Sequence, residues 1–422
     1  MIPILYLAPV EWSSIWQRPQ QLAVRLGRHF RVHYVDPVGL RSVRLRDITR
    51  IRHAWRSPPQ PAKHPVIKPR YLPWPGNRLV EPLNRRWLMR QMATQFDFER
   101  QPWILWLGSP SLLADELLKR AEPSLVVYDS MDRVGAFHRG RTRQRIERTE
   151  ASLVARADLV LASSHGLAER WGAIKEVMLV PNGVDVAAFA QRPADCPPEW
   201  HRDTSRRVIG FHGTLGEWLD YDLLARLAQR HADWLWVFIG PIHSQRAKSL
   251  LRLPNVCLPG PVPYPALAEQ AAWFDVGLIP FRLNELTRYV HPIKALEYLA
   301  LGLPVVSSRL PDLSEHADVI SFASTFDDWS ARLEDAVAPA ARLPKRVEAR
   351  RRVAGAHDWD RRVEAIVSRI AVHLPCGRLE NGLPRPSTRF VDGLGRPSSR
   401  RAANTSSHKF QSVSPQPLVP SP

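Results

Sequence analysis

The chain has 422 residues, 44% of them hydrophobic, which is enough for two ordinary domains with buried cores. No apolar run reaches the roughly 18–20 residues that cross a bilayer, and Met1–Leu7 lacks the basic segment of a signal peptide and soon meets Glu11. Cys196, Cys257 and Cys376 lie far apart without a CxxC pair, so a disulfide framework and a structural zinc site are excluded and a reducing, cytoplasmic compartment is expected.

The charge is strongly positive, since 59 Lys and Arg residues against 41 Asp and Glu residues give +18. Arginine-rich usage can follow from genomic base composition alone, and this explanation stays open. The functional explanations are an anionic membrane, a nucleotide-diphosphate substrate or nucleic acid.

In the first part of the chain, short apolar runs alternate with helical patterns, which predicts a parallel α/β sheet. The expected strands are Ile2–Leu7, Val32–Asp36, Ile104–Leu107, Leu125–Tyr128, Leu159–Ala162 and Val177–Val180. The stretch Trp12–Ala23 follows the first strand and leads into a helix, where a doubly wound fold binds its ligand. Arg18 is placed there to reach a diphosphate or an acceptor, or equally to be a solvated arginine at a helix start.

Residues 41–100 carry fourteen basic and four acidic side chains, a balance of +10, with Trp55, Trp74 and Trp87 interleaved. Basic side chains with interfacial tryptophans predict a surface that rests on anionic lipid, at the inner face of the plasma membrane. The alternative is a solvated insertion whose tryptophans pack inward.

The predicted strand at Val126 breaks into a loop with Asp129, Asp132 and Arg133, and loops after strand ends carry ligand contacts in open α/β sheets. We expect Asp129 to cap the following turn. Asn182-Gly183 marks a turn, and the proline-containing residues 187–206 are interpreted as a linker between a domain of residues 1–186 and a domain of residues 207–356.

A second α/β series follows the linker. Its expected strands are Val208–His212, Leu235–Gly240, Val256–Leu258, Val276–Pro280, Pro304–Ser307 and Val319–Phe322, with helices at Tyr221–Arg230, Ala266–Phe274 and Lys294–Leu301. After the first of these strands, Gly213 and Thr214 lie in a turn of small residues that permits close approach of a phosphate.

The stretch from His291 to Ser307 predicts a helix with Pro292 in its first turn and Gly302 at its end. Lys294 and Glu297 lie near the positive N-terminal end, where an anion can be held and Glu297 can accept hydrogen bonds from ribose hydroxyls. An ordinary amphipathic helix with an exposed Lys–Glu pair fits the spacing equally well.

The pattern P-x-K-x-x-E-Y-x-A-x-G-x-P-V-V from Pro292 to Val306 resembles the donor-site helix of GT-B glycosyltransferases of the retaining family 4, also called group 1. The resemblance, weaker elsewhere, runs from about residue 2 to residue 372. It implies two Rossmann-like, doubly wound domains facing across a cleft. It also implies hexosyl transfer, with retention, from a nucleotide-diphosphate sugar such as a UDP-sugar to a glycan or lipid-linked acceptor in cell-envelope or exopolysaccharide synthesis.

The resemblance implies site residues as well. Catalytic roles fall to Asp132, His138 and Lys294. Donor contacts fall to Gly213, Thr214, Gly240, Arg288, Tyr289, His291, Pro292, Lys294 and Glu297. Acceptor or phosphate contacts fall to Arg18 and Ser13. No cofactor is implied, and no metal ligand is expected because Asp129-x-x-Asp132 is not the D-x-D of metal-dependent GT-A enzymes.

Two positions depart from the family pattern. Tyr289 stands where the E-x7-E motif ending at Glu297 has its first glutamate. The loop after Gly213 also lacks the Arg and Lys that usually hold the diphosphate, so a substitute is needed. The substitutes available nearby are Lys294, Arg288, His291 and Arg18.

Residues 357–374 resemble the final helix of the family, which crosses back to the first domain, although any amphipathic helix fits as well. Residues 375–422 are rich in Pro, Ser and Arg without periodicity, and we expect them to be disordered. Two rival functions remain: a catalytically silent GT-B scaffold, and a basic nucleic-acid-binding protein, for which no helix-turn-helix, zinc-finger or RRM pattern is seen.

Overall fold

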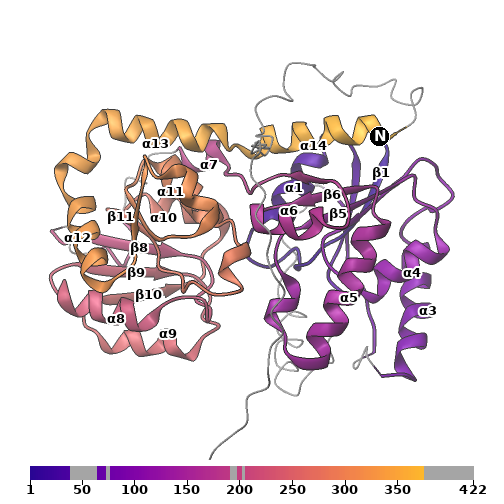
Figure 1. Ribbon diagram of the computed structural model, residues 1–422, viewed down its shortest axis with the longest axis horizontal. Coiled ribbons are helices and arrows are strands. Elements are labelled where there is room, and N and C mark those ends of the chain that lie inside the picture. The colour runs from indigo at the N-terminus through magenta and orange to yellow at the C-terminus, as the bar shows by residue number, and fades with distance from the viewer. Residues whose placement is uncertain (39–63, 73–76, 191–196, 202–204, 375–422) are drawn as a thin grey trace, which may run out of the picture. The chain divides into compact units, whose positions relative to one another are not determined.

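The computed structural model describes residues 1–38, 64–72, 77–190, 197–201 and 205–374, and Met1–Leu383 form one compact unit. Within this unit two separate parallel sheets are each covered by helices (Figure 1). Trp55, Trp74 and residues 375–422 lie outside the described residues, so the predictions made for them stay predictions.

The first sheet has seven described strands in the order β3-β2-β1-β4-β5-β6-β7, all paired in parallel. Its strands are β1 Pro3–Leu7, β2 Arg31–Val35, β3 Val66–Ile67, β4 Ile104–Leu107, β5 Leu125–Ser130, β6 Leu159–Ala162 and β7 Val177–Leu179. Six of these strands confirm the expected ones. The short edge strand β3 was not predicted, because two residues show no periodicity.

The helices that connect these strands begin with ordinary capping chemistry. Ser111 and Ser164 accept hydrogen bonds from the backbone N–H groups of Ala114 and Leu167, at the starts of α4 and α6. The helices are α1 Arg18–Leu26, α3 Val80–Ala93, α4 Leu112–Arg120, η2 Val134–Phe137, α5 Gly140–Arg156, α6 His165–Gly172 and α7 Val186–Phe189.

Two apolar cores lie on the two faces of the first sheet. Ile4 and Tyr6 of β1 belong to one core, and Leu5 and Leu7 belong to the other. Strands buried on both faces read as continuous apolar runs, and this is why they could be recognised from the sequence.

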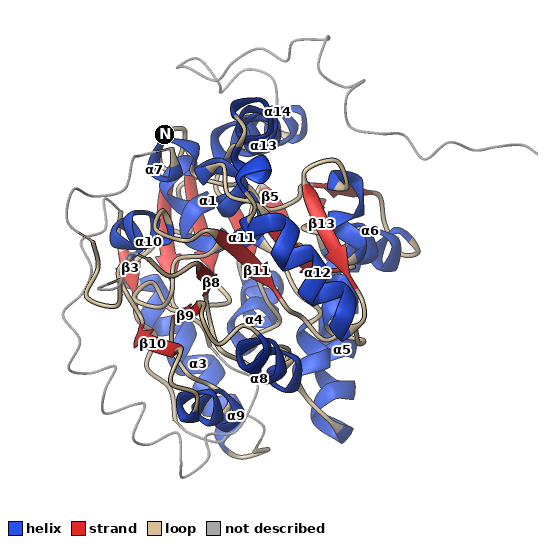
Figure 2. Cartoon of the chain, turned by 90° about the vertical axis from the view of Figure 1, so that its left-hand side faces the viewer, coloured by secondary structure: helices blue, strands red, loops and turns tan. Residues whose placement is uncertain are grey.

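The second sheet has six described strands in the order β10-β9-β8-β11-β12-β13, also parallel (Figure 2). Its strands are β8 Val208–His212, β9 Leu235–Ile239, β10 Val256–Gly260, β11 Val276–Ile279, β12 Val305–Ser308 and β13 Ile320–Ala323. Its helices are α8 Tyr221–Arg230, α9 Gln245–Ser249, η3 Leu250–Arg252, α10 Tyr264–Ala271, η4 Thr287–Tyr289, α11 Ile293–Leu301, η5 Pro311–His316, α12 Phe326–Val337, η6 Pro339–Arg342 and α13 Pro344–Ala356.

The last described helix, α14 Trp359–His373, returns from the second sheet to the first and lies beside α1 (Figure 1). Trp359, Val363 and Ile366 belong to the first-sheet core. Arg25 of α1 binds Asp360 of α14 at 2.6 Å and Asp185 at 3.0 Å, so the end of the chain is tied to the first helix by apolar packing and ion pairs.

A buried ion pair joins α1 to β5. Arg18 is fully buried, and its Nε and Nη2 donate to the carboxylate of Asp129 at 2.8–3.1 Å. Its Nη1 donates to the carbonyl of Val180 at 2.8 Å and to Oδ1 of Asn182 at 3.4 Å. Asp129 therefore holds Arg18 instead of capping the next turn, and the expected cap is wrong.

Asp129→Ala should lower the free energy of unfolding by about 3–5 kcal/mol, because it leaves the Arg18 guanidinium buried without its counter-ion. Glu348→Ala is the matched control, since its ion pair with Arg352 is about three-quarters exposed and should contribute about 0.3–0.5 kcal/mol. Urea denaturation followed by tryptophan fluorescence measures both changes, and equal losses in the two variants would contradict the prediction.

Candidate functional site

A cavity of about 340 Å³ lies between the two sheets, at the carboxyl ends of their strands. Arg18, Asp132 and Asn182 line it from the first-sheet side. From the second-sheet side it is lined by His212, Gly213, Thr214, His291, Pro292, Lys294 and Glu297. The volume falls in the range of small-molecule sites, and the position is where open α/β sheets bind ligands.

Helix α11 provides much of this lining, and its predicted boundaries are confirmed. It begins after Pro292 and ends at Gly302, which adopts a φ of 80°. Leu296 and Ala300 are buried in the second core, as the apolar stripe predicts, and Ile293 packs against the first-sheet core. Glu297 is only 5% exposed, so an exposed Lys–Glu pair is excluded.

Two glycines bring the loops after β8 and β9 into backbone contact. Gly213 has a φ of 120° and Gly240 a φ of 148°, and a Cβ on Gly240 would lie 2.1 Å from the carbonyl oxygen of Gly213. A Cβ on Gly213 would lie 3.2 Å from Cε of Lys294. The loop is therefore shaped to carry the Lys294 side chain across it, with the ammonium 5.1–5.5 Å from the ring centres of Phe211 and Phe281.

Lys294 and Glu297 perturb each other inside this enclosed site. Burial lowers the pKa of Lys294, and the carboxylates of Glu297 and Asp132 oppose that shift. Burial raises the pKa of Glu297, and Lys294 opposes it. Nε2 of His212 lies 3.5 Å from Oε2 of Glu297, and burial together with Lys294 lowers the pKa of His212 to about 3, so this imidazole is neutral at pH 7.

Asp132 enters the cavity from the loop after β5. Burial raises the pKa of its carboxyl to about 7, although the charges of Arg18 and Lys294 oppose the shift. A carboxyl group titrating near neutral pH can donate or accept a hydrogen bond, which is the property required of a group facing a reacting hydroxyl.

His291 lies just before the N-terminal end of α11 and is held by a contact from the first-sheet side. Nδ2 of Asn182 donates to the carbonyl of His291 at 2.7 Å, and the same Asn182 accepts from Arg18. The ring of His291 is buried and both of its nitrogens lack a hydrogen-bond partner among the described residues. Its imidazole is therefore available to a ligand in the cavity.

Five predicted site residues do not line this cavity. Tyr289 packs on α6, where its ring lies 3.0 Å from the Cβ position of Gly166 and under the guanidinium of Arg133 at 5.0 Å. Arg288 is exposed beside it, because the η4 turn directs both residues away from the cavity. His138 and Ser13 do not line the cavity, although they are close in sequence to the lining residues Phe137 and Ile15. Gly240 does not line it either, but it packs closely against the backbone of Gly213, which does.

The structure places the four expected substitutes for the missing diphosphate cations differently. Arg18 faces the cavity but its guanidinium is committed to Asp129, so the expected phosphate or acceptor contact is not supported, and it is not a solvated helix-start residue either. Arg288 points elsewhere, and burial and neighbouring cations lower the pKa of His291 to about 3. Among the described residues, Lys294 is the cation left beside the Gly213 turn.

Several lining residues were missed by sequence reasoning. Trp16 and Tyr264 come from opposite sides of the cavity and stack with ring centres 5.9 Å apart. His212 directly precedes Gly213, so a polar residue ending an apolar strand was an available signal. Trp16 and Tyr264 carry no such signal, because nothing in a sequence pairs two aromatic residues about 250 positions apart.

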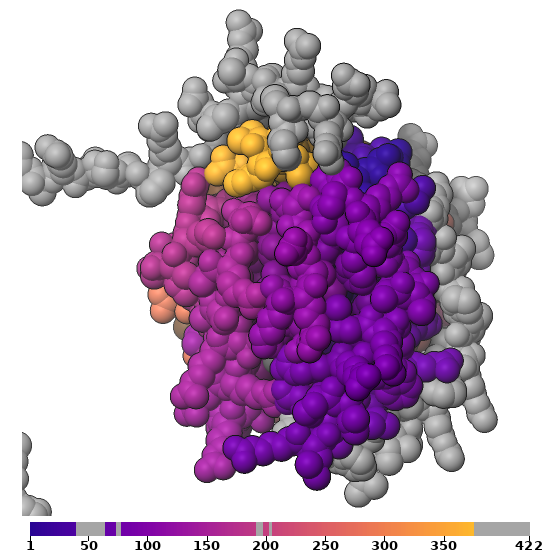
Figure 3. Space-filling view, turned by 90° about the vertical axis from the view of Figure 1, so that its right-hand side faces the viewer, coloured from indigo at the N-terminus to yellow at the C-terminus, as the bar shows by residue number. Residues whose placement is uncertain are grey.

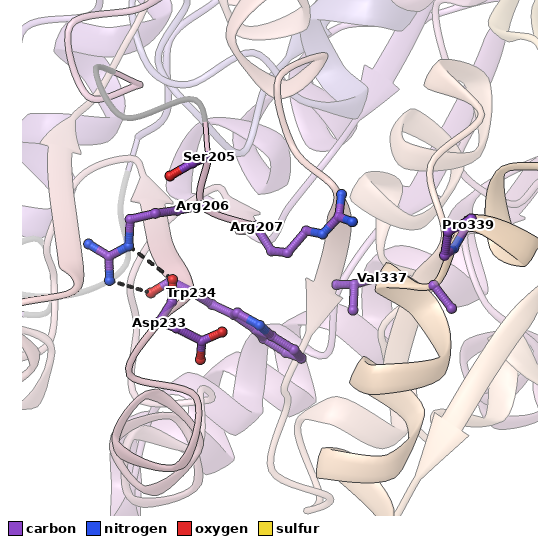
Figure 4. A pocket seen from close by; sticks show the side chains of 8 residues that line it. Ser205, Arg206, Arg207, Asp233, Trp234, Val337 and Pro339 are labelled. Atoms are coloured by element: carbon purple, nitrogen blue, oxygen red, sulfur yellow. Dashed lines mark hydrogen bonds between the residues drawn. The ribbon is translucent and has the colours of Figure 1, made fainter.

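A second cavity of about 770 Å³ lies at the opposite, amino-terminal edge of the second sheet (Figure 4). Arg206 there donates to the backbone carbonyls of Asp233 and Trp234, and Arg207 lies 3.9 Å from Asp275. These arginines are engaged within the domain and lie away from the loops at the strand ends, so we assign the ligand site to the interdomain cavity.

In the part of the chain that the structure describes, no helix is long and apolar enough to cross a membrane. The described residues also contain no cluster of three or more His, Cys, Asp or Glu side chains arranged to hold a metal ion.

The two parallel sheets and the cavity between them have the GT-B architecture, and comparison with known proteins shows what the chain is similar to. Residues 206–342 match the model of the family described as glycosyl transferases group 1. Together with the relatives below, this match supports a group 1 glycosyltransferase of GT-B architecture, and neither the silent scaffold nor the nucleic-acid-binding protein is favoured.

Among curated proteins, the chain is 29% identical over 205 residues to TuaH of Bacillus subtilis, which is described as a putative teichuronic acid biosynthesis glycosyltransferase. The aligned part covers 45% of this chain, and the chain spans about half (52%) of the length of that relative.

Among solved structures, sucrose-phosphate synthase from Thermosynechococcus elongatus aligns over 88% of this chain and 99% of its own, with a TM-score of 0.65 and 14% identity. HepE of Anabaena, solved in complex with UDP and glucose, aligns over 88% and 100%, with a TM-score of 0.64 and 14% identity. At these identities the likeness shows the fold.

The buried neutral histidines should make the protein sensitive to mild acid. Because the pKa of His291 is lowered to about 3, the unfolded chain binds more protons than the folded chain between about pH 6.5 and pH 3. The contribution of His291 to the free energy of unfolding should therefore fall as the pH falls through this window, by about 2 kcal/mol between pH 7 and pH 5, while the raised pKa values of Asp132 and Glu150 act in the opposite direction.

His291→Asn should reduce the pH dependence of the free energy of unfolding by that amount. His373→Asn, at an exposed position, should leave this pH dependence unchanged. Parallel pH profiles for the wild type and His291→Asn would contradict the assignment of His291 as a buried neutral imidazole.

Proposed function

We propose that this chain transfers a hexosyl group from a nucleotide-diphosphate sugar to a glycan or lipid-linked acceptor. The observation that carries the proposal is the placement of Lys294, at the N-terminal end of α11, across the Gly213 turn inside the interdomain cavity. A diphosphate in this place would meet the ammonium, the positive end of the helix and closely approachable backbone.

In the proposed reaction the bond between the anomeric carbon and the diphosphate oxygen breaks, and the acceptor oxygen bonds to the anomeric carbon as its hydroxyl loses a proton. Negative charge then grows on the diphosphate, next to Lys294. Burial lowers the pKa of this lysine, and a bound polyanion would raise it again and gain a strong interaction in a poorly solvated site.

The remaining lining residues have consistent roles. Glu297 would accept hydrogen bonds from ribose hydroxyls, and its burial strengthens such bonds. Asp132 faces the cavity from the first-sheet side with a pKa of about 7, which suits a group that contacts the acceptor hydroxyl.

Finer features of the proposal rest on resemblance. UDP as the nucleotide is supported by HepE, solved with UDP and glucose, and by the Escherichia coli trehalose-6-phosphate structure bound with UDP-2-fluoro glucose. Polysaccharide synthesis in the cell envelope is supported by the relative TuaH. Retention of anomeric configuration rests on the donor-helix motif, and proton NMR of the first product formed tests it.

The first experiment compares how well UDP and GDP stabilise the protein against thermal unfolding. A ligand that binds the folded state stabilises it by mass action, and more so the more tightly it binds. Because we propose UDP as the nucleotide, UDP should raise the midpoint of thermal unfolding more than GDP does. Lys294→Gln should weaken UDP binding by about 1–3 kcal/mol while leaving uridine binding unchanged, and Glu297→Ala should weaken both by similar amounts.

Lys345→Gln, on α13 outside the cavity, is the control and should bind UDP like the wild type. If no nucleoside diphosphate stabilises the folded wild type, or if Lys294→Gln and Lys345→Gln behave alike, the proposed donor site is wrong.

We further propose that the reaction needs no divalent metal, because Lys294 and the N-terminal end of α11 supply the positive charge that the leaving diphosphate requires. Turnover measured with the UDP-sugar that binds best should persist in excess EDTA. Activity that is abolished by EDTA and restored by Mn²⁺ would refute this part of the proposal.

A lipid-linked acceptor would be met at a membrane, and we propose that the protein works in the cytoplasm at the anionic inner face of the plasma membrane. The positive balance of residues 41–100 supports this location.

A further inference from the structure

An apolar stripe lies on the outer face of α3. Leu79, Leu83 and Trp87 follow one another at intervals of four residues and are 81%, 59% and 43% exposed. Leu72, which is 39% exposed, is held beside the helix by hydrogen bonds between its backbone and Asn84. Side chains spaced by four residues share one helix face, so these form a continuous exposed apolar strip.

The surroundings of this strip are basic. Arg78, Arg86 and Arg90 are exposed, and no ion pair of theirs is found among the described residues. Lys68 and Arg70 are also exposed nearby. The acidic residue of α3, Glu81, is on the other side, where it binds Arg85 and Arg145. The outer face of the helix itself therefore combines apolar and positive side chains, with the acidic residue of α3 on the opposite side.

The inner face of α3 is firmly anchored, so the outer strip is not an accident of a loosely placed helix. Leu88 and Met92 are buried in the first-sheet core. Arg85 binds Asp115 and Glu116 of α4 at 2.8 and 2.9 Å. A rigid helix with one face committed to the core presents the other face as a preformed surface.

We propose that this outer face of α3, with its flanking arginines, is the part of the protein that docks on an anionic lipid surface. Helices of this composition lie in the membrane interface, with leucine and tryptophan inserted among the headgroups and arginines on the lipid phosphates. This rests on the proposed function for its location and goes beyond it by assigning the surface. α3 lies at the right-hand edge of Figure 1, on the side of the first domain that faces the viewer in Figure 3.

Helix α5 lies between the inner side of α3 and the cavity. Arg145 of α5 binds Glu81 of α3 at 2.8 Å, and Arg143, one half-turn earlier, binds Glu285 from the second-sheet side. Phe137, in the turn before α5, is half exposed and lines the cavity. An acceptor anchored in the lipid next to α3 would thus reach the cavity along α5.

The test is sedimentation of the full chain with vesicles of phosphatidylglycerol and phosphatidylcholine, and with phosphatidylcholine alone. The wild type should bind the anionic vesicles and lose affinity as salt rises. The double variant Leu83→Glu with Arg86→Glu should bind at least about ten-fold more weakly, since it removes one apolar anchor and reverses one charge.

The matched control is Leu251→Glu with Arg252→Glu, an exposed leucine and arginine on the second domain that change the charge by the same amount. It should bind like the wild type. Residues 375–422 are present in every variant, so a difference between the two double variants reports on α3. Stabilisation by UDP should be unchanged in both, which keeps this test separate from that of the donor site.

Equal binding of the two double variants would overturn the proposal, whether both bind like the wild type or both are weakened. Equal binding to anionic and neutral vesicles would also overturn it. So would a wild-type oligomer, seen by sedimentation velocity without lipid, that the α3 variant dissociates, since the face would then join copies of the chain. If the double variant fails to fold, Trp87→Ser with Arg90→Gln serves in its place.

Discussion

The buried contact between Arg18 and Asp129 organises the join between the two halves of this protein. A guanidinium that is fully removed from water requires several partners, and Arg18 finds them on β5, after β7 and in the Asn182-Gly183 turn. Asn182 then holds the carbonyl of His291, directly before α11. One arginine near the start of the chain thereby helps to set the position of α11, nearly three hundred residues later.

That network changes how the charges of the cavity are understood. Of the described residues, Arg18 and Lys294 bring a guanidinium and an ammonium to the cavity, but the two are not equivalent. Arg18 is neutralised by the carboxylate of Asp129, whereas among the described residues the carboxylates that act on Lys294 are those of Asp132 and Glu297, neither of which forms an ion pair with it. A cation without a close partner in an enclosed site gains most from an arriving anion, and this is why the proposed diphosphate site is at Lys294 and the Gly213 turn.

In the proposed membrane face, too, some charged side chains are paired and hold the structure, whereas others are exposed. Glu81 and Arg85 form ion pairs toward α4 and α5, which leaves the opposite face of α3 with leucines, a tryptophan and arginines. The ion pairs fix the helix, and the unpaired side determines what it contacts. Part of the overall charge of +18 is therefore gathered on one face of a helix, whatever genomic base composition contributes to the rest.

The sequence by itself determined the fold class, nearly every strand and helix α11 with its two ends. These features depend on local patterns: apolar runs buried on both faces of a sheet, proline at a helix start and glycine at its end. It also predicted Lys294 and Glu297 as neighbours in one helix turn, and both line the cavity.

Only the tertiary structure decided which other side chains share the cavity. Tyr289 is eight residues before Glu297 but packs against α6, because the η4 turn directs its side chain away from the cavity. The spacing of residues in a sequence motif does not predict that orientation. Arg18 looked free in the sequence because its partner, Asp129, is 111 residues distant. Trp16 and Tyr264 meet only because two separately folded sheets face each other. Local periodicity is set within a few residues, whereas a cavity is set by distances between segments that only packing brings together.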